Sequence, residues 1–284
     1  MQIQPQLYAL TTAGPQPLPV PPTAADFTDL YDELALGVYS VIRTFHHNRF
    51  LHLDHHLART VKSMALLGWD YQLDEQRLRR AIHDLCTAYP APEMRIRIDI
   101  LAAPATARGS DSRELLALMP FTPPSPTLYA EGVTVGFATG LHRANPLAKT
   151  ADFAKARKEA EDAHFYEHLL TDDQGAILEA TSANFYGVRD GVLYTAGEGV
   201  LEGVTRRIVL DLVTKLGIPL QLQAVRVDEI PRLDEALISS SSRGIMPVVQ
   251  IGDQTIGDGT PGPSTKRLIT AYNDYVEAHL QTAV

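Results

Sequence analysis

An acidic residue, a small polar loop and a glycine before a predicted helix are the residues best suited to hold an anionic ligand. Glu179 ends a predicted strand and is followed by a polar segment that reaches Asn184. Further along the chain, Gly203-Val204-Thr205 stands directly at the start of a predicted helix. Backbone N–H groups at a helix N-terminus donate to phosphate oxygens, and the helix dipole favours negative charge there. Because the same residues also serve as an ordinary helix cap, both interpretations stay open.

Two further segments carry cations that suit the same chemistry. The segment from Arg143 to Thr150 contains Lys149, and the segment from Leu53 to Arg59 ends in an arginine. A lysine shielded from water loses its proton more easily and then attacks carbonyl carbons. An arginine fork matches the geometry of a phosphate dianion. Residue types alone do not distinguish Lys149 from the nearby Lys155 and Lys158.

Histidines and the lone cysteine suggest other chemistry, which we do not favour. Five histidines fall within eleven residues, namely His46, His47, His52, His55 and His56. They span a predicted turn, a strand and a helix start without a His-Glu-x-x-His pattern, so we predict no metal site. Cys86, the only cysteine, lies on the apolar side of a predicted helix, which predicts a buried, inert thiol.

The hydrophobic pattern predicts the elements that position these residues. In the first half we expect strands over 38–45, 50–53 and 94–100, a helix that Asp54 caps and Gly68 ends, and a helix from Asp74. In the second half we expect strands over 133–139, 168–171, 176–179, 184–189, 219–225 and 236–240, helices over 152–163, from Thr205 to Gly217 and over 264–280, and a hairpin at Gly252-Asp253. Helices mixed with hairpins are typical of an α+β protein.

The proline-rich segment Thr122-Pro123-Pro124-Ser125-Pro126 marks the clearest change in composition. We therefore predict a small N-terminal domain over residues 1–121, a linker over 122–132 and a C-terminal domain over 133–284. A chain of 284 residues is long enough for two domains.

The overall composition is that of a soluble globular protein. Hydrophobic residues make up 45% and charged residues 21%, and the net charge is −9. This acidic balance argues against nucleic acid or an anionic membrane as partner. We find no apolar run of about 18 residues and no signal peptide pattern, and a single cysteine permits no intramolecular disulfide. We therefore expect a cytoplasmic protein that binds no membrane.

Taken together and in this order, the motifs resemble those of the fold-type IV, or class IV, pyridoxal-phosphate aminotransferases, over roughly residues 30 to 275. The matching segments are Val38-Tyr39 with Arg43, the Leu-Asp-x-His-Leu-x-Arg segment over 53–59, Lys149, residues 179–184, residues 203–206 and Gly244-Ile245-Met246-Pro247-Val248. The resemblance implies a two-domain fold, with a small N-terminal α/β sandwich and a larger, β-barrel-like C-terminal domain with flanking helices. It also implies pyridoxal 5'-phosphate as cofactor and a homodimer.

The resemblance also implies roles for residues on the cofactor side. Lys149 matches the lysine that forms the Schiff base with the cofactor, and Glu179 matches the acid that contacts the pyridine nitrogen. Arg59 matches the arginine that binds the phosphate group. Val204, Thr205 and Ser241 match the remaining phosphate donors.

On the substrate side, the resemblance implies a pocket aromatic at Tyr39 and carboxylate binding by the turn that holds Ser242 and Arg243. Arg95 and Arg97 lie on the polar face of strand 94–100, and we favour Arg97 as a second carboxylate-binding residue. An ion pair between Arg97 and Asp99 or another acid is the alternative.

We expect an aminotransferase that moves an amino group between an amino acid and a 2-oxo acid, with Lys149 as the base. A branched-chain L-amino acid, a D-amino acid and an (R)-amine all remain possible donors. The alternative enzyme is an aminodeoxychorismate-type lyase that releases pyruvate. A binding protein without activity would need neither Lys149 nor Glu179.

Overall fold

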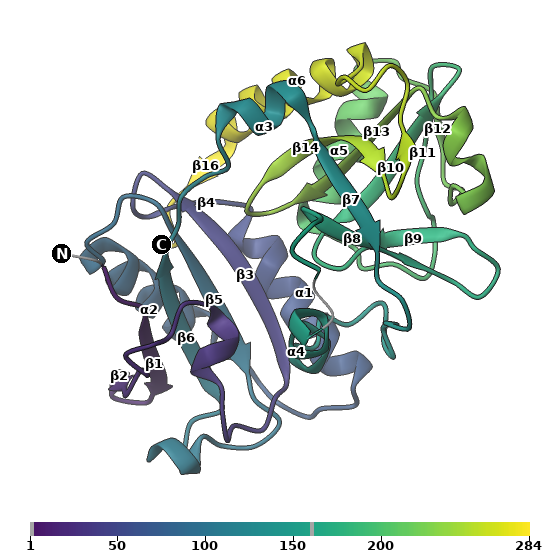
Figure 1. Ribbon diagram of the computed structural model, residues 1–284. Coiled ribbons are helices and arrows are strands. Elements are labelled where there is room, and N and C mark those ends of the chain that lie inside the picture. Colours follow the sequence, from purple (N-terminus) through teal and green to yellow (C-terminus); the bar gives the residue numbers. More distant parts are fainter. Residues whose placement is uncertain (1–2, 160–161) are drawn as a thin grey trace. The chain divides into compact units, whose positions relative to one another are not determined.

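The computed structural model describes residues 3–159 and 162–284 and divides into two compact units (Figure 1). Unit 1 comprises Met1–Thr122, Ala148–Lys155 and His279–Val284, and unit 2 comprises Pro123–Leu147 and Ala156–Ala278. The first division follows Thr122, next to the proline-rich segment. Residues 148–155, which include Lys149, belong with the N-terminal unit, whereas we predicted them in the C-terminal domain.

Unit 1 is built on an antiparallel seven-stranded sheet with the order β16-β4-β3-β5-β6-β1-β2. The strands are β1 (Gln6–Thr11), β2 (Gly14–Leu18), β3 (Val38–Phe45), β4 (Arg49–Leu51), β5 (Met94–Ile100), β6 (Glu114–Pro120) and β16 (Leu280–Gln281). The helices are α1 (Leu53–Leu66) and α2 (Glu75–Ala88), with short 3-10 turns η1 (Phe27–Leu30) and η2 (Thr106–Arg108). Strand β5 has the predicted bounds and lies between β3 and β6.

Both faces of the unit 1 sheet are buried. Met94, Ile96 and Ile98 of β5 join residues of α1 and α2 in one core. On the other face, Leu115 and Ala117 of β6 pack with Phe27 of η1. The sequence pattern did not predict β6, because a strand buried on both faces forms a continuous apolar run without alternation.

The predicted cap of α1 is wrong. The helix begins at Leu53, and its N-cap is His52 in the left-handed conformation at φ 52° and ψ 54°. Asp54 lies inside the first turn instead, where its negative charge interacts favourably with the helix dipole. The other end matches the prediction, because Gly68 follows the helix at φ +71°.

Unit 2 is built on a larger mixed sheet with the order β12-β11-β10-β13-β14-β7-β8-β9, and β15 pairs with β14. The strands are β7 (Val133–Phe137), β8 (Glu167–Thr171), β9 (Ile177–Ala180), β10 (Asn184–Arg189), β11 (Val192–Tyr194), β12 (Leu220–Gln221), β13 (Glu235–Ser240), β14 (Gly244–Ile251) and β15 (Gln254–Thr255). The helices are α3 (Pro126–Glu131), α5 (Val204–Lys215) and α6 (Pro263–His279), with the 3-10 turn η3 (Val227–Arg232). His279, the last residue of α6, belongs to unit 1, and the rest of the helix belongs to unit 2.

Two predicted elements of the second half differ from the structure. Of the strand predicted over 219–225, only the two residues of β12 form a strand, which lies at the edge of the sheet and pairs with β11 alone. The helix predicted over 152–163 is α4 (Ala151–Glu159), and residues 160–161 lie outside the described part of the chain. Ala151, Phe153 and Ala154 of this helix are buried.

No helix within the described ranges 3–159 and 162–284 combines the length and the apolar character needed to cross a lipid bilayer.

A glycine before β3 tests how tightly unit 1 is packed. A Cβ at Gly37 would lie 2.0 Å from the Ile100 carbonyl oxygen and 2.8 Å from the Trp69 ring. Backbone atoms move little, so Gly37→Ala is expected to lower the free energy of unfolding by about 2 kcal/mol. Gly68→Ala is the control, because nothing lies within 4 Å of its Cβ position and only its φ of +71° opposes alanine. Chemical denaturation measures both, and equal costs would refute the packing argument.

Candidate active site

Lys149 is fixed to unit 1 by its backbone. Its carbonyl accepts a hydrogen bond from the Tyr39 N–H at 3.0 Å, and its own N–H donates to Ser63 Oγ at 3.2 Å. The neighbouring Thr150 forms a bridge with Val38. The Lys149 Nζ atom lies 4.7 Å from the centroid of the Tyr39 ring. Strand β3 therefore determines where this lysine stands.

Arg59, three residues after His56 on α1, is part of a buried hydrogen-bond relay. Its Nη2 donates to Ser40 Oγ at 2.9 Å, and Ser40 Oγ lies 2.9 Å from His56 Nδ1. Burial, followed by the charges of Arg59 and Lys149, holds the pKa of His56 well below its usual value. In the tautomer with its proton on Nε2, the neutral imidazole accepts the Ser40 proton at Nδ1, which leaves Ser40 Oγ to accept from Arg59.

Arg97 forms a buried ion pair with Asp99, two residues further along β5. The guanidinium contacts both carboxylate oxygens at 2.7–3.0 Å, and the Tyr31 hydroxyl donates to Asp99 Oδ2 at 2.6 Å. Arg97 is 3% exposed and Asp99 1% exposed. Burial raises the pKa of Asp99 although Arg97 opposes this effect. Arg97 thus has the ion pair that we left open as its alternative role.

Glu179 stands at the centre of a hydrogen-bond network in unit 2. Arg143 Nε donates to Glu179 Oε1 at 2.7 Å, and the side chains of the pair are 6% and 3% exposed. Glu179 Oε2 accepts from Asn184 Nδ2 and from the Leu201 N–H, both at 3.3 Å. A buried carboxylate needs such partners to keep its charge, and Arg143 supplies the opposite charge.

The start of α5 lies beside this network. Asn184 Nδ2 also donates to the Leu201 carbonyl at 3.0 Å, and a Cβ on Gly203 would come within 2.3 Å of Asn184 Oδ1. Only glycine allows this approach. The first turn of α5 contains no acidic residue, and Val204 and Thr205 in it are buried. The helix dipole and the free backbone N–H groups therefore favour an anion at this end.

Arg243, in the turn between β13 and β14, is clamped to Glu167 of β8. Its Nη2 lies 2.8 Å from Glu167 Oε2 and 2.6 Å from Ser182 Oγ, and its Nε donates to Ser240 Oγ at 3.1 Å. Burial disfavours the charged carboxylate, but Arg243 and the hydroxyls of Ser182 and Thr181 outweigh this and lower the pKa of Glu167 to about 2. Ser241 and Ser242 share the turn and are half-buried.

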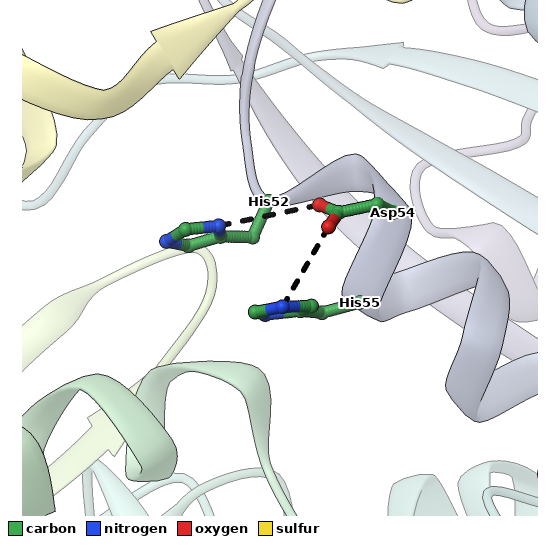
Figure 2. Close-up of side chains that lie close together, drawn as sticks. All are labelled: His52, Asp54 and His55. Carbon is green, nitrogen blue, oxygen red and sulfur yellow. Dashed lines mark ion pairs between the residues drawn. The ribbon is translucent and has the colours of Figure 1, made fainter.

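The histidine cluster takes a compact form at the start of α1. Figure 2 shows the His52 and His55 rings next to each other, each facing the Asp54 carboxylate, whose oxygens lie 4.0 and 3.6 Å from the two imidazoles. The two imidazole rings stack with centroids 4.6 Å apart. Donor atoms around a zinc ion with bonds of about 2.1 Å lie about 3.4 Å apart, closer than in this cluster. That the protein holds no metal stays a prediction.

The thiol of Cys86 is 0% exposed, and burial raises its pKa to about 12. This agrees with the prediction of an inert cysteine.

The sequence matches one family model over most of its length. The model of the class IV amino-transferases covers residues 37–251. The chain belongs to the class IV aminotransferases. This family depends on pyridoxal phosphate, so the predicted family, enzyme class and cofactor are confirmed.

Individual proteins of known name agree with this assignment. This class IV aminotransferase is 29% identical to the D-alanine aminotransferase of Bacillus licheniformis over 262 residues, covering 89% of this chain and 92% of that protein. It is 32% identical to the D-alanine aminotransferase of Staphylococcus aureus (strain N315) over 105 residues, 36% of this chain and 37% of that protein.

Solved structures confirm the predicted fold. The branched-chain aminotransferase from the archaeon Thermoproteus uzoniensis with norvaline matches with a TM-score of 0.74 and 22% identity, over 98% of this chain and 99% of that chain. The branched-chain amino acid aminotransferase from Escherichia coli matches with a TM-score of 0.75 and 18% identity, over 100% of this chain and 99% of that chain. At these identities the likeness shows the fold alone.

For two candidate residues of this aminotransferase, the sequence did not predict the side chain that forms the ion pair. Arg143 appeared in the sequence analysis only as the start of a segment, because 36 residues separate it from Glu179. Glu167 did not appear there, because 76 residues separate it from Arg243. No spacing rule connects such distant positions. Asp99 was the exception, because alternation along a strand places residues 97 and 99 on one face.

Breaking the clamp between Arg243 and Glu167 is expected to destabilise the aminotransferase. Arg243→Ala leaves a buried carboxylate without its charged partner, which costs about 3–5 kcal/mol. Arg189→Ala is the matched control, because the ion pair of Arg189 with Glu229 is 25% and 24% exposed and, as a pair in contact with solvent, is expected to contribute much less. Urea denaturation distinguishes the two variants. Similar losses would show that the clamp is no stronger than a surface pair.

The same clamp predicts a pH dependence of stability. The pKa of Glu167 is about 2 in the folded protein and 4.5 without the protein environment. Its contribution of about 3 kcal/mol is therefore complete above pH 4.5 and disappears as the pH falls toward 2. Glu167→Gln is expected to flatten the stability profile between these values. Denaturation midpoints of wild type and variant across that range, if parallel, would contradict this assignment.

Proposed function

We propose that this class IV aminotransferase transfers the amino group of a D-amino acid to a 2-oxo acid. The observation that carries this choice is the similarity to the D-alanine aminotransferase of Bacillus licheniformis, which extends over 92% of that protein. The branched-chain enzymes are similar in fold, at 22% and 18% identity. Similarity in fold at these identities does not indicate which substrate the enzyme uses.

The residues present fit pyridoxal phosphate. A phosphate dianion suits the start of α5, where the Val204 N–H and the Thr205 hydroxyl stand in a turn without acidic residues. We assign phosphate binding to these two groups, to Ser241 and to the Arg59 guanidinium. A protonated pyridine nitrogen suits Glu179, which already has a cation, Arg143, on its Oε1. The start of α5 therefore suits the phosphate group of the cofactor, and Glu179 suits its pyridine nitrogen.

Lys149 is assigned to the covalent bond with the cofactor and to proton transfer. When bound, pyridoxal phosphate acts as an electron sink for the carbon that loses its proton. The amine of Lys149 is the base that removes this proton from the substrate Cα and returns it at the other end of the transfer. Its backbone bonds to Tyr39 and Ser63 fix the main chain from which this side chain extends.

On the substrate side, we assign Tyr39 to the pocket wall and the turn with Ser242 and Arg243 to the substrate carboxylate. Glu167 already neutralises the Arg243 guanidinium, so the turn contributes its backbone N–H groups, and Arg243 keeps the turn in place. Arg97 is not included, because Asp99 holds its guanidinium in a buried pair.

We further propose a homodimer in the cytoplasm. The family resemblance supports the dimer, and the single, buried Cys86 is compatible with a reducing compartment. Light scattering coupled to size-exclusion chromatography tests the dimer, and a mass of 31.1 kDa in solution would refute it.

The first experiment records the visible absorption spectrum of the purified protein with pyridoxal phosphate. A yellow band is expected to bleach on addition of D-alanine, while L-leucine and (R)-1-phenylethylamine leave it unchanged. Lys149→Ala is expected to lose the band and about 1,000-fold or more in activity. Lys158→Ala, on the following helix α4, is the control and keeps both.

Other outcomes of this experiment assign other functions. Bleaching by L-leucine alone would make the protein a branched-chain enzyme, and bleaching by the amine alone an amine transaminase. A stable band that no donor bleaches, together with pyruvate release from aminodeoxychorismate, would favour the lyase.

The ion pair at Glu179 generates a second prediction. Arg143→Met removes the cation that keeps this buried carboxylate charged, so the affinity for pyridoxal phosphate is expected to fall by about 10-fold or more. Fluorescence titration of the cofactor-free protein measures the dissociation constant. Arg226→Met serves as control, because its pair with Asp228 is 48% and 76% exposed. Unchanged affinity in Arg143→Met would separate Glu179 from cofactor binding.

A further inference from the structure

A stack of charged and aromatic side chains in unit 1 ends at Lys149. Its members are Asp99, Arg97, Tyr31 and Tyr39. The Arg97 Cζ atom lies 4.2 Å from the centroid of the Tyr31 ring and 4.3 Å from that of the Tyr39 ring. Lys149 Nζ lies 4.7 Å from the same Tyr39 centroid. One aromatic ring thus contacts two cations.

Arg97 is held rigidly at the far end of this stack. Asp99 accepts hydrogen bonds from its Nε and Nη2, and the two residues are 3% and 1% exposed. Tyr31 contacts the guanidinium with its ring and donates its hydroxyl proton to Asp99 at 2.6 Å. Such an arginine has its charge neutralised and its planar group surrounded, which suits packing against a ring better than capture of a substrate carboxylate.

At the near end, the Tyr39 ring affects the charge of the lysine amine. The face of an aromatic ring attracts an ammonium group and not the neutral amine. The Tyr39 N–H also bonds to the Lys149 carbonyl at 3.0 Å, so ring and lysine are fixed to each other through the backbone. Because Asp99 neutralises Arg97, the arginine supports the ring without repelling the ammonium across it.

We propose that Arg97, fixed by Asp99 and Tyr31, is a positioning residue that holds the Tyr39 ring against Lys149 and so stabilises the proton-bearing form of its amine. This inference rests on the proposed function, in which Lys149 carries the proton during transfer. The face of the Tyr39 ring stabilises the Lys149 ammonium group and so keeps the proton on Nζ.

The test measures the pKa of Lys149 in the intact 284-residue chain without cofactor. Trace acetylation at a series of pH values, followed by mass spectrometry of the peptide with Lys149, reports the fraction of neutral amine. The variants are Tyr39→Phe, Tyr39→Leu and the charge-balanced double variant Arg97→Met/Asp99→Asn. Arg95→Met is the matched control, because Arg95 lies on the same strand and face but contacts Phe27 and Phe121.

Tyr39→Phe and Arg95→Met are expected to leave the pKa of Lys149 unchanged. Tyr39→Leu is expected to lower it by about 0.5 to 1 pH unit, because the ammonium loses the ring. Arg97→Met/Asp99→Asn is expected to lower it in the same direction, although no net charge is removed. Tyr31→Phe is a milder variant that keeps the ring and deletes only the hydroxyl bond to Asp99. It is expected to give a smaller shift of the same sign, which matters if the double variant does not fold.

An unchanged pKa in the double variant, or in Tyr31→Phe if the double variant does not fold, would overturn the proposal. So would a large increase in KM for 2-oxo acids with the pKa of Lys149 unaltered, because Arg97 would then bind the substrate carboxylate. The labelling needs no cofactor and no turnover. Its result therefore stays interpretable even if the protein proves not to use D-amino acids, and the two failures are distinguishable.

Discussion

The pairing of residues 149–151 with the start of β3 is the constraint on which the functional arrangement of unit 1 depends. Tyr39 bonds to the Lys149 carbonyl, Thr150 bridges to Val38, and the Ala151 N–H donates to the Gly37 carbonyl. These backbone bonds bring a segment from beyond the middle of the chain onto the N-terminal sheet. As a result, Lys149 stands beside a rigid strand although it is carried by a connecting segment.

Three buried arginine–carboxylate pairs organise the surroundings of the candidate residues. Arg97 with Asp99 lies on one strand, whereas Arg143 with Glu179 and Arg243 with Glu167 join distant parts of unit 2. Ion pairs of this kind add little stability over apolar residues of equal size, since both charges lose their hydration. They penalise any arrangement that separates the partners. We interpret them as devices that select one conformation of the segments that carry Arg97, Glu179 and the turn at Arg243.

Two of these pairs and one hydrogen-bond relay place titratable groups in defined surroundings. Arg143 supplies Glu179 with a positive partner, and Arg243 keeps Glu167 ionised. In the relay of Arg59, Ser40 and His56, burial keeps the imidazole neutral. In all three pairs the guanidinium group faces a carboxylate of the protein itself.

The sequence by itself was sufficient for the family, for strands such as β5, and for the order of the motifs around Lys149, Glu179 and Thr205. Local periodicity and short motifs carry that information, because they depend on residues close together in the chain. Tertiary structure alone decided that residues 148–155 belong to unit 1, that His52 and not Asp54 precedes α1, and that Arg143 and Glu167 are the partners of Glu179 and Arg243. Apart from the helix cap, these outcomes depend on contacts between positions far apart in the chain, such as Arg143 and Glu179, which 36 residues separate, and Glu167 and Arg243, which 76 residues separate. The burial that makes each contact favourable does not exist until the chain has folded.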